Sequence, residues 1–152
     1  MKKFKIVLFE PEIPQNTGNI ARLCACTGAE LYLVGKLGFV LSDKYLKRAG
    51  LDYWGDVEIK HLNSLDELMQ QNVDANIYFL STKAKKLYTE QKFLPGDIFI
   101  FGSESKGLPE EFITEYIDIS LRIPMKAGKR SLNLSNTAAI VLYEAIRQTD
   151  YI

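Results

Sequence analysis

Residues 122–136 read Arg-Ile-Pro-Met-Lys-Ala-Gly-Lys-Arg-Ser-Leu-Asn-Leu-Ser-Asn, and the rest of the chain is organised around this stretch. Its first part is expected to close a β-strand, because Pro124 has no N–H group to give to a sheet ladder. A short basic loop around Gly128 follows. An apolar helix is then expected from Ala138 to Ile146. Four small polar side chains crowd the entrance to that helix: Ser131, Asn133, Ser135 and Asn136.

Polar side chains at a helix entrance have two interpretations. They can cap the helix by accepting hydrogen bonds from the free N–H groups of its first turn. They can also line a ligand site that is built on the helix N-terminus. Capping is the commoner role for a single Ser or Asn, but the basic loop beside this cluster favours a site.

The remainder of the chain alternates between expected strands and expected helices. Apolar runs at residues 4–9, 31–34, 77–80 and 97–101 are typical of buried strands, and residues 57–62 and 116–123 alternate in polarity as strands do. Helices are expected between them, one capped by Asn16 or Thr17, one with a capping box at Ser64 and Glu67, and one starting at Pro109. This order predicts an α/β fold with a mostly parallel sheet flanked by helices, in a single domain spanning residues 1–152.

Composition limits the possible functions. The 19 basic and 19 acidic residues give a net charge of zero, so any binding of nucleic acid must use local patches. No stretch approaches the ~20 apolar residues of a membrane span, and no signal peptide is recognisable, so a soluble cytoplasmic protein is expected. The two cysteines do not have the spacing of a zinc site, and no metal is expected.

Three loops leave the ends of expected strands, at residues 80–86, 102–109 and 124–133. In parallel sheets, ligands bind beyond the carboxyl ends of the strands. These loops hold Glu104 but no His or Cys, which argues against the common nucleophile designs. A P-loop is excluded as well, because Leu108 and Pro109 follow the second glycine. The residues alone predict a small-ligand site, suited to a flat ring such as adenine, beside a surface for an anionic substrate.

Three segments resemble the signature motifs of SPOUT-class RNA 2′-O-methyltransferases, in the same order and spacing. They are Asn16-Thr-Gly-Asn-Ile-Ala-Arg22, Phe101-Gly-Ser-Glu-Ser-Lys-Gly-Leu-Pro109, and Ile123-Pro-Met with Ser131-Leu-Asn-Leu-Ser-Asn136. The resemblance covers nearly the whole chain. Glu10-Pro-Glu-Ile-Pro14 and Arg48-Ala-Gly-Leu-Asp-Tyr53 are similar to the branch that modifies the wobble nucleotide, position 34, of tRNA.

The resemblance implies a fold, a cofactor and an assembly. The C-terminal segment would thread a deep trefoil knot, and the protein would be a homodimer. Each subunit would bind S-adenosyl-methionine, leaving S-adenosyl-homocysteine after methyl transfer to a cytidine or modified uridine. The cofactor-binding residues would be Leu80, Gly102, Ile123, Ser131 and Leu132.

The resemblance also implies catalytic residues: Arg22, Asn16, Glu104, Ser131 and Asn133. Asn16 and Arg22 would face the substrate and the site of the partner subunit, and Arg22 would handle the proton of the ribose hydroxyl. A guanidinium is essentially never neutral, so Arg22 could instead hold a phosphate that accepts the proton.

Contact with the tRNA anticodon stem-loop is a separate prediction. A dimer could join the basic patches of both subunits and add their phosphate contacts. The candidate residues are Lys44, Lys47, Arg48, Lys126, Lys129 and Arg130. The alternatives are a 2′-O-methyltransferase for another tRNA or rRNA site, a knotted RNA-binding module without catalysis, and a nucleotide-binding regulator.

Overall fold

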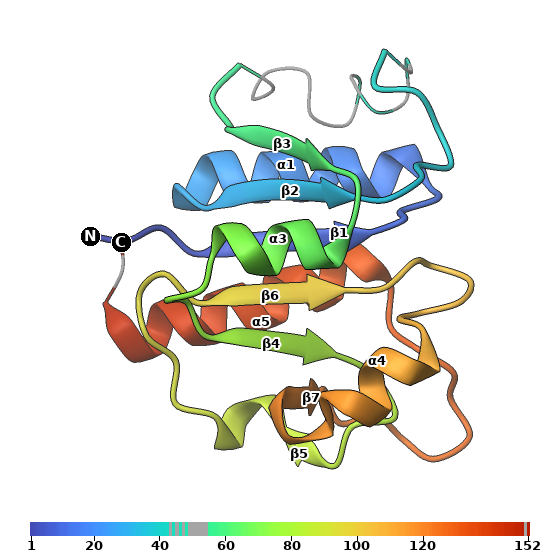
Figure 1. The fold of residues 1–152 in the computed structure, drawn as a ribbon, viewed down its shortest axis with the longest axis vertical. Coiled ribbons are helices and arrows are strands. Elements are labelled where there is room, and N and C mark those ends of the chain that lie inside the picture. Colours follow the sequence, from blue (N-terminus) through green and yellow to red (C-terminus); the bar gives the residue numbers. More distant parts are fainter. Residues whose placement is uncertain (43, 45, 47, 49–54, 151) are drawn as a thin grey trace.

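The fold is built on one parallel β-sheet (Figure 1). The structure is a computed structural model that describes residues 1–42, 44, 46, 48, 55–150 and 152. Within these residues the sheet has seven strands in the order β3-β2-β1-β6-β4-β7-β5, and every strand pair is parallel. The strands are β1 (Lys5–Phe9), β2 (Glu30–Val34), β3 (Ile59–Leu62), β4 (Ile77–Leu80), β5 (Lys86–Leu87), β6 (Ile98–Phe101) and β7 (Ser120–Arg122).

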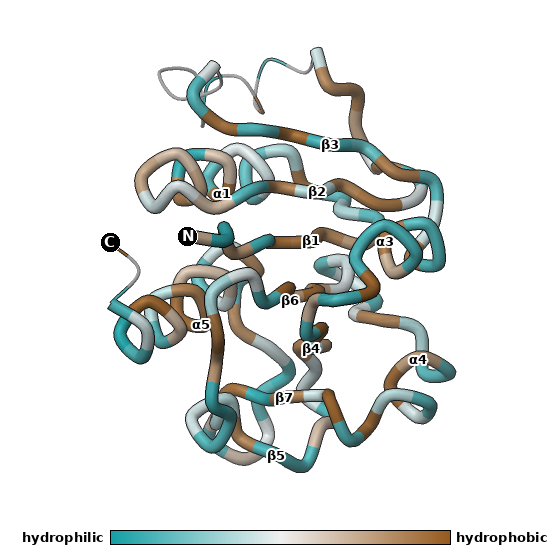
Figure 2. The backbone as a smooth tube through the Cα atoms, turned by 60° about the vertical axis from the view of Figure 1, so that its left-hand side comes forward, coloured by the Kyte–Doolittle hydropathy of each residue, from teal (hydrophilic) through white to brown (hydrophobic). Residues whose placement is uncertain are grey.

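Helices cover both faces of the sheet, as Figures 1 and 2 show from two directions. Helices α1 (Pro14–Thr27) and α5 (Leu134–Thr149) pack against each other on one face. The shorter α3 (Leu65–Gln71) and α4 (Glu110–Glu115) lie on the other face. Two 3-10 turns, η2 (Tyr88–Glu90) and η3 (Ile117–Ile119), complete the described elements. The predicted α/β class with helices on both faces is confirmed.

The central strands are buried on both sides, which explains their nearly continuous apolar sequences. Ile6 and Leu8 of β1 pack into the cluster under α1 and α5, whereas Val7 packs into the cluster under α3 and α4. In β6, Phe99 packs into the cluster under α1 and α5, and Ile100 packs into the cluster under α3 and α4. Each of these side chains stabilises the fold by about 1.5–3 kcal/mol when it is fully buried.

One expected strand is largely wrong. Residues 116–123 alternate in polarity, but η3 occupies Ile117–Ile119 and only Ser120–Arg122 form β7. The hydroxyl of Ser120 donates a hydrogen bond to the carbonyl oxygen of Tyr116 at 2.8 Å and closes the turn. The other expected strands are present within a residue or two at their ends, and the two-residue strand β5 was not expected.

The helix starts also differ from expectation. The capping box at α3 is confirmed at its N-cap, where the Glu67 N–H donates to the Ser64 hydroxyl at 3.1 Å. The expected cap of α1 is wrong, because α1 begins at Pro14 after Ile13, and Ile13 contributes no side-chain cap. The final helix begins at Leu134, one turn earlier than predicted, with Asn133 as its N-cap.

Candidate functional site

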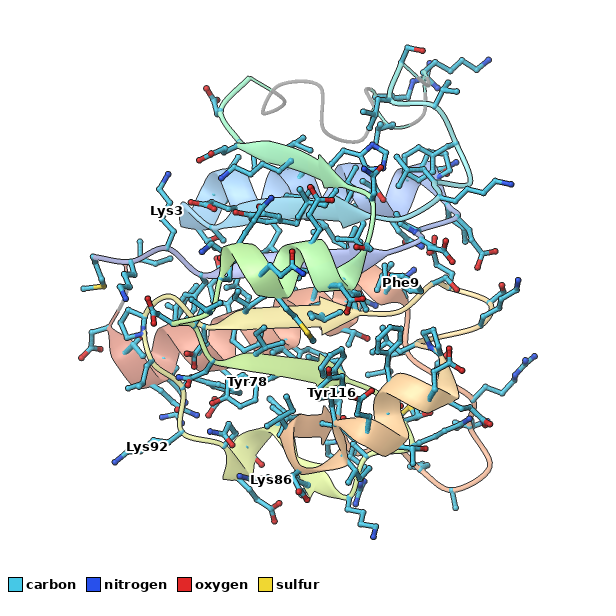
Figure 3. The ribbon with its side chains drawn as sticks, viewed as in Figure 1. Lys3, Phe9, Tyr78, Lys86, Lys92 and Tyr116 are labelled. Carbon is cyan, nitrogen blue, oxygen red and sulfur yellow. The ribbon has the colours of Figure 1, made fainter. Side chains whose placement is uncertain are left out.

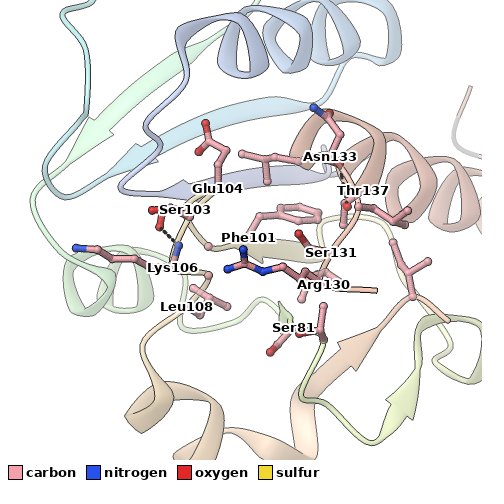
Figure 4. A pocket seen from close by; sticks show the side chains of 18 of the residues that line it. Ser81, Phe101, Ser103, Glu104, Lys106, Leu108, Arg130, Ser131, Asn133 and Thr137 are labelled. Atoms are coloured by element: carbon pink, nitrogen blue, oxygen red, sulfur yellow. Dashed lines mark hydrogen bonds between the residues drawn. The ribbon is translucent and has the colours of Figure 1, made fainter. Parts of the chain in front are cut away.

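The three strand-end loops meet at one cavity of about 590 Å³ (Figure 4). Strands β6, β4 and β7 are parallel neighbours in the sheet, so their carboxyl ends lie at the same edge. The loops that follow them form the cavity together with the start of α1. All five residues predicted to bind the cofactor line this cavity: Leu80, Gly102, Ile123, Ser131 and Leu132.

The loop after β6 forms one wall of the cavity with its own main chain. The N–H of Gly107 donates to the carbonyl oxygen of Ser103 at 2.9 Å, and Gly107 has a positive φ of 66°. A Cβ atom added to Gly102 would lie 2.1 Å from the carbonyl carbon of Gly107. The two glycines therefore allow the chain to fold back on itself so closely that a side chain at residue 102 has no room.

The carboxylate of Glu104 accepts hydrogen bonds from the segment before α1. The N–H groups of Glu12 and Ile13 donate to it at 3.0 and 2.5 Å, and the Asn16 amide nitrogen donates at 3.3 Å. The side chain of the N-cap residue Ile13 cannot accept a hydrogen bond, and the carboxylate from this distant loop instead satisfies the N–H groups of Ile13 and of the residue before it.

Asn16 and Asn133 extend this network to α5. The amide nitrogen of Asn133 donates to Oδ1 of Asn16 at 3.1 Å. Oδ1 of Asn133 in turn accepts from the N–H groups of Ser135 and Asn136 at 2.9 and 3.3 Å. Asn133 thus caps α5 and also lines the cavity. A continuous set of hydrogen bonds joins Glu104, Asn16 and Asn133.

The cavity combines an apolar interior with cationic side chains. Phe101, Leu108 and Leu121 are buried side chains that contribute to its lining. Arg130 and Lys106 line it from opposite loops, and both are labelled in Figure 4. Apolar walls with a few polar groups and main-chain donors suit a flat heterocycle, as the sequence predicted.

Some lining residues were not predicted from the sequence. Thr137 lies one helical turn after Asn133, and its hydroxyl donates to the Asn133 carbonyl oxygen at 3.1 Å. The spacing of four residues in a helix could have placed it on the same face. Ile13 and Met125 also line the cavity; both lie in quoted motifs, but neither was predicted as a site residue.

Arg22 is not brought into the cavity of its own chain. It is exposed on α1, six residues beyond Asn16, which corresponds to about 9 Å along a helix axis. It is absent from the described residues that line the cavity. The structure therefore unites Asn16, Glu104, Ser131 and Asn133 and leaves Arg22 outside.

The predicted RNA-binding residues fall into two groups. Lys126, Lys129 and Arg130 are exposed on the loop between β7 and α5. Lys44 and Arg48 are exposed as well, whereas Lys47 lies outside the described residues. Two other lysines have side-chain partners: Lys83 forms an ion pair with Glu110, and Lys86 donates a hydrogen bond to Gln91 at 2.8 Å.

Cys24 and His61 lie in surroundings that are typical of residues with a structural role. Cys24 is buried, and burial raises the pKa of its thiol to about 12, so it stays protonated at neutral pH. His61 Nε2 lies 3.0 Å from the carbonyl oxygen of Gly35. In the part of the chain that the structure describes, no three His, Cys, Asp or Glu residues are grouped as metal ligands, and no helix has the length and apolarity to span a membrane.

The fold and the site define a class of RNA methyltransferase. Residues 3–143 match the SpoU rRNA methylase family, and the chain belongs to this family. The resemblance seen in the three sequence motifs is thereby confirmed.

Similar proteins and solved structures include RNA methyltransferases that act on tRNA and on rRNA. A protein of Saccharophagus degradans named tRNA (cytidine(34)-2′-O)-methyltransferase is 51% identical over 152 residues, covering 97% of both chains. A solved structure described as giving insights into "the 2-OH methylation of C/U34 on tRNA" is 41% identical, with a TM-score of 0.91 over 97% of this chain and 96% of that one. An AdoMet-bound rRNA methyltransferase from Sinorhizobium meliloti is 25% identical, with a TM-score of 0.83 over 95% of this chain and 56% of that one.

Proposed function

We propose that this protein transfers the methyl group of S-adenosyl-methionine to the ribose 2′-hydroxyl of nucleotide 34, a cytidine or modified uridine, in tRNA. The main support for the proposal is that all five residues predicted to bind the cofactor line one cavity. Membership of the SpoU rRNA methylase family supports methyl transfer. The names of the similar proteins support nucleotide 34 as the target.

The residues of the cavity fit S-adenosyl-methionine. Leu80, Ile123 and Leu132 provide apolar surface for the adenine ring, and the close approach of Gly102 to Gly107 presents main chain rather than a side chain to the ligand. Ser131 provides a hydroxyl at the cavity. When bound, the cofactor supplies a methyl group that its sulfonium has already activated, so the protein has mainly to position the reactants and remove a proton.

The 2′-oxygen forms a bond to the methyl carbon while the carbon–sulfur bond breaks, and the hydroxyl proton must leave. Asn16, Glu104 and Asn133 hold the mouth of the cavity in one geometry through their shared hydrogen bonds. Arg22 either handles the hydroxyl proton directly or binds the neighbouring phosphate, which then accepts it. The second route keeps the guanidinium charged, which is the form that an arginine side chain has in proteins.

Arg22 can act in this reaction if two subunits combine. It is exposed on α1, outside its own cavity, so a homodimer that brings α1 of one subunit to the cavity of the other would complete the site. Apolar side chains exposed on α5 support such an interface, since Ile140 is 36% and Tyr143 is 50% exposed in the single chain. Sedimentation of the protein at micromolar concentration tests the assembly, and a monomer would argue against it.

Two further features accompany the proposal. The C-terminal segment forms a deep trefoil knot, an arrangement that is rare in proteins and is supported here by family membership. Pulling the chain by its termini tests the knot, because a knotted chain extends to less than its full contour length. In this proposal the reaction takes place in the cytoplasm, with tRNA as the substrate.

The tRNA contact uses the basic loops next to the cavity. Lys126, Lys129 and Arg130 are exposed beside the ligand site, where they can hold the backbone of the anticodon stem-loop. Lys44, Lys47 and Arg48 form the second candidate patch, and a homodimer would join the patches of both subunits. Their contacts would make binding dependent on salt, because each neutralised phosphate releases counterions.

A methyl-transfer assay with two matched tRNAs tests the function. One carries an ordinary ribose at nucleotide 34, and the other carries a 2′-deoxyribose there and is otherwise identical. We expect transfer from labelled S-adenosyl-methionine to the first only, because the second lacks the attacking hydroxyl. Equal labelling of both would point to another tRNA site, and labelling of rRNA alone to a ribosomal substrate. Binding of tRNA without any transfer would indicate a non-catalytic module.

A further inference from the structure

A reciprocal contact joins residue 12 to the cavity wall. The Glu12 carboxylate accepts hydrogen bonds from the N–H and the hydroxyl of Ser105, at 3.1 and 2.6 Å. The N–H of Glu12 donates in return to Oε1 of Glu104 at 3.0 Å. Each segment therefore gives an N–H group to a carboxylate of the other, and we call these three hydrogen bonds the Glu12 clamp.

The other side of residue 12 is fixed against the loop after β2. The N–H of Gly38 donates to the carbonyl oxygen of Pro11 at 2.9 Å. A Cβ atom added to Gly38 would lie 2.8 Å from Cα of Glu12, so this approach requires glycine. Glu12 is thus anchored to the strand-end loops of the sheet, and its carboxylate reaches the cavity wall from that anchor.

The clamp holds the wall that residues 103–107 form. Residues 103–107 all line the cavity, and Ser105, Lys106 and Gly107 are exposed. The bond from the Gly107 N–H to Ser103 shapes the loop internally but does not fix its place in the molecule. The hydrogen bonds that join residues 104 and 105 to residues 12, 13 and 16 supply that fixing.

We propose that Glu12 is a positioning residue that sets the affinity for S-adenosyl-methionine by holding the 103–107 wall in its binding geometry. The inference rests on the function proposed above. Without the clamp the wall would occupy other positions part of the time, and the apparent dissociation constant would rise by the inverse of the competent fraction. Charged acceptors make the stronger hydrogen bonds, so the carboxylate is well suited to this task.

The protonation state of Glu12 agrees with this role. The hydrogen bonds from the Ser105 hydroxyl and N–H lower the pKa of the Glu12 carboxyl below its usual value. The group is therefore ionised at neutral pH and accepts both bonds. The clamp is complete above the ordinary carboxyl pKa and weakens only when the pH falls through the lowered value.

Calorimetric titration with S-adenosyl-methionine tests the clamp with four variants. We expect about tenfold weaker binding for Glu12→Ala and about threefold for Ser105→Ala, in which the N–H bond remains. The double variant should bind no more weakly than Glu12→Ala, because the Ser105 hydroxyl has already lost its acceptor. Glu111→Ala, an exposed carboxylate on α4 outside the cavity lining, is the matched control and should bind like the wild type.

Turnover separates positioning from a general structural effect. With saturating cofactor, kcat of Glu12→Ala should stay within about twofold of the wild type while KM for the cofactor rises in parallel with the dissociation constant. Wild-type affinity in Glu12→Ala would overturn the inference, and so would strictly additive losses in the double variant. If Glu12→Ala does not fold in a thermal melt, Ser105→Ala decides alone, and unchanged affinity there counts against the clamp. Failure of the wild type itself to bind the cofactor would instead refute the proposed function.

Discussion

The N–H of Ile13 donates a hydrogen bond to the Glu104 carboxylate at 2.5 Å, so that a residue 91 positions later in the chain caps helix α1. The same carboxylate lies at the cavity and binds the amide of Asn16. The start of α1 and the wall of the ligand site are therefore one hydrogen-bonded unit. A change at Glu104 is expected to affect stability and ligand binding together.

Glu104→Ala removes the cap of α1 and one partner of Asn16. We expect the free energy of unfolding to fall by about 1–2 kcal/mol, as for the loss of other helix caps. Binding of S-adenosyl-methionine should weaken as well, because Asn16 loses a bond that orients it. Urea unfolding and calorimetry measure the two effects, with Glu111→Ala as control. A variant with weaker binding but unchanged stability would contradict the capping role.

Gly102→Ala tests the close approach of the two glycines. The new Cβ atom would meet main-chain atoms of residues 107 and 108 at 2.1–2.2 Å, so the wall must move. We expect a loss of about 1–3 kcal/mol in the free energy of unfolding, typical of overpacking, and a clear loss of cofactor affinity. Gly55→Ala is the control, since a Cβ atom there meets none of the described residues within 4 Å. Equal behaviour of the two variants would show that the approach is not required.

Two threonines of α1 provide a matched pair for stability. Among the described residues, Thr17 has a fully buried hydroxyl with no hydrogen-bond partner, whereas the Thr27 hydroxyl donates to the Leu23 carbonyl oxygen at 2.8 Å. Thr17→Val should raise the free energy of unfolding by about 1 kcal/mol, because an unpaired polar group leaves the core. Thr27→Val should lower it by a similar amount. Chemical denaturation measures both, and changes of the same sign would be inconsistent with this explanation.

The basic loop before α5 should control tRNA affinity. Reversing the charges of Lys126 and Lys129 is expected to weaken tRNA binding and to reduce the slope of log affinity against log salt by about 2. Cofactor affinity should not change. The double reversal of Lys3 and Lys92 is the control, because Figure 3 places both at the end of the molecule away from the cavity loops. A salt slope that is unchanged in the loop variant would exclude these lysines from the contact.

Sequence patterns predicted the features that depend on local spacing. The apolar runs of β1, β4 and β6 identified a parallel sheet, and parallel strands bring the loops after them to one edge. That is why the expected cofactor residues from three distant segments, such as Leu80 and Ser131, proved to line one cavity.

The errors came from side-chain hydrogen bonds that the local sequence patterns do not show. Asn16 has the composition of an N-cap, but Glu104 caps α1 and Asn16 bonds across to Asn133. Rules based on neighbouring residues cannot predict that a distant carboxylate takes the capping role from Asn16. The alternation at residues 116–123 likewise gave way to a turn that the Ser120 hydroxyl closes. The position of Arg22 outside the cavity of its own chain is not such an error, because the resemblance implies that Arg22 faces the site of the partner subunit.

The central claim is that this protein methylates the 2′-hydroxyl of tRNA nucleotide 34 and that Arg22 is needed for the reaction. Mass spectrometry of tRNA from a strain without the gene tests both parts most directly. We predict that the 2′-O-methyl group at nucleotide 34 is lost, and that the wild-type gene and Lys92→Ala restore it while Arg22→Ala does not. Normal methylation of nucleotide 34 in the deletion strain, or its full recovery with Arg22→Ala, would contradict the account.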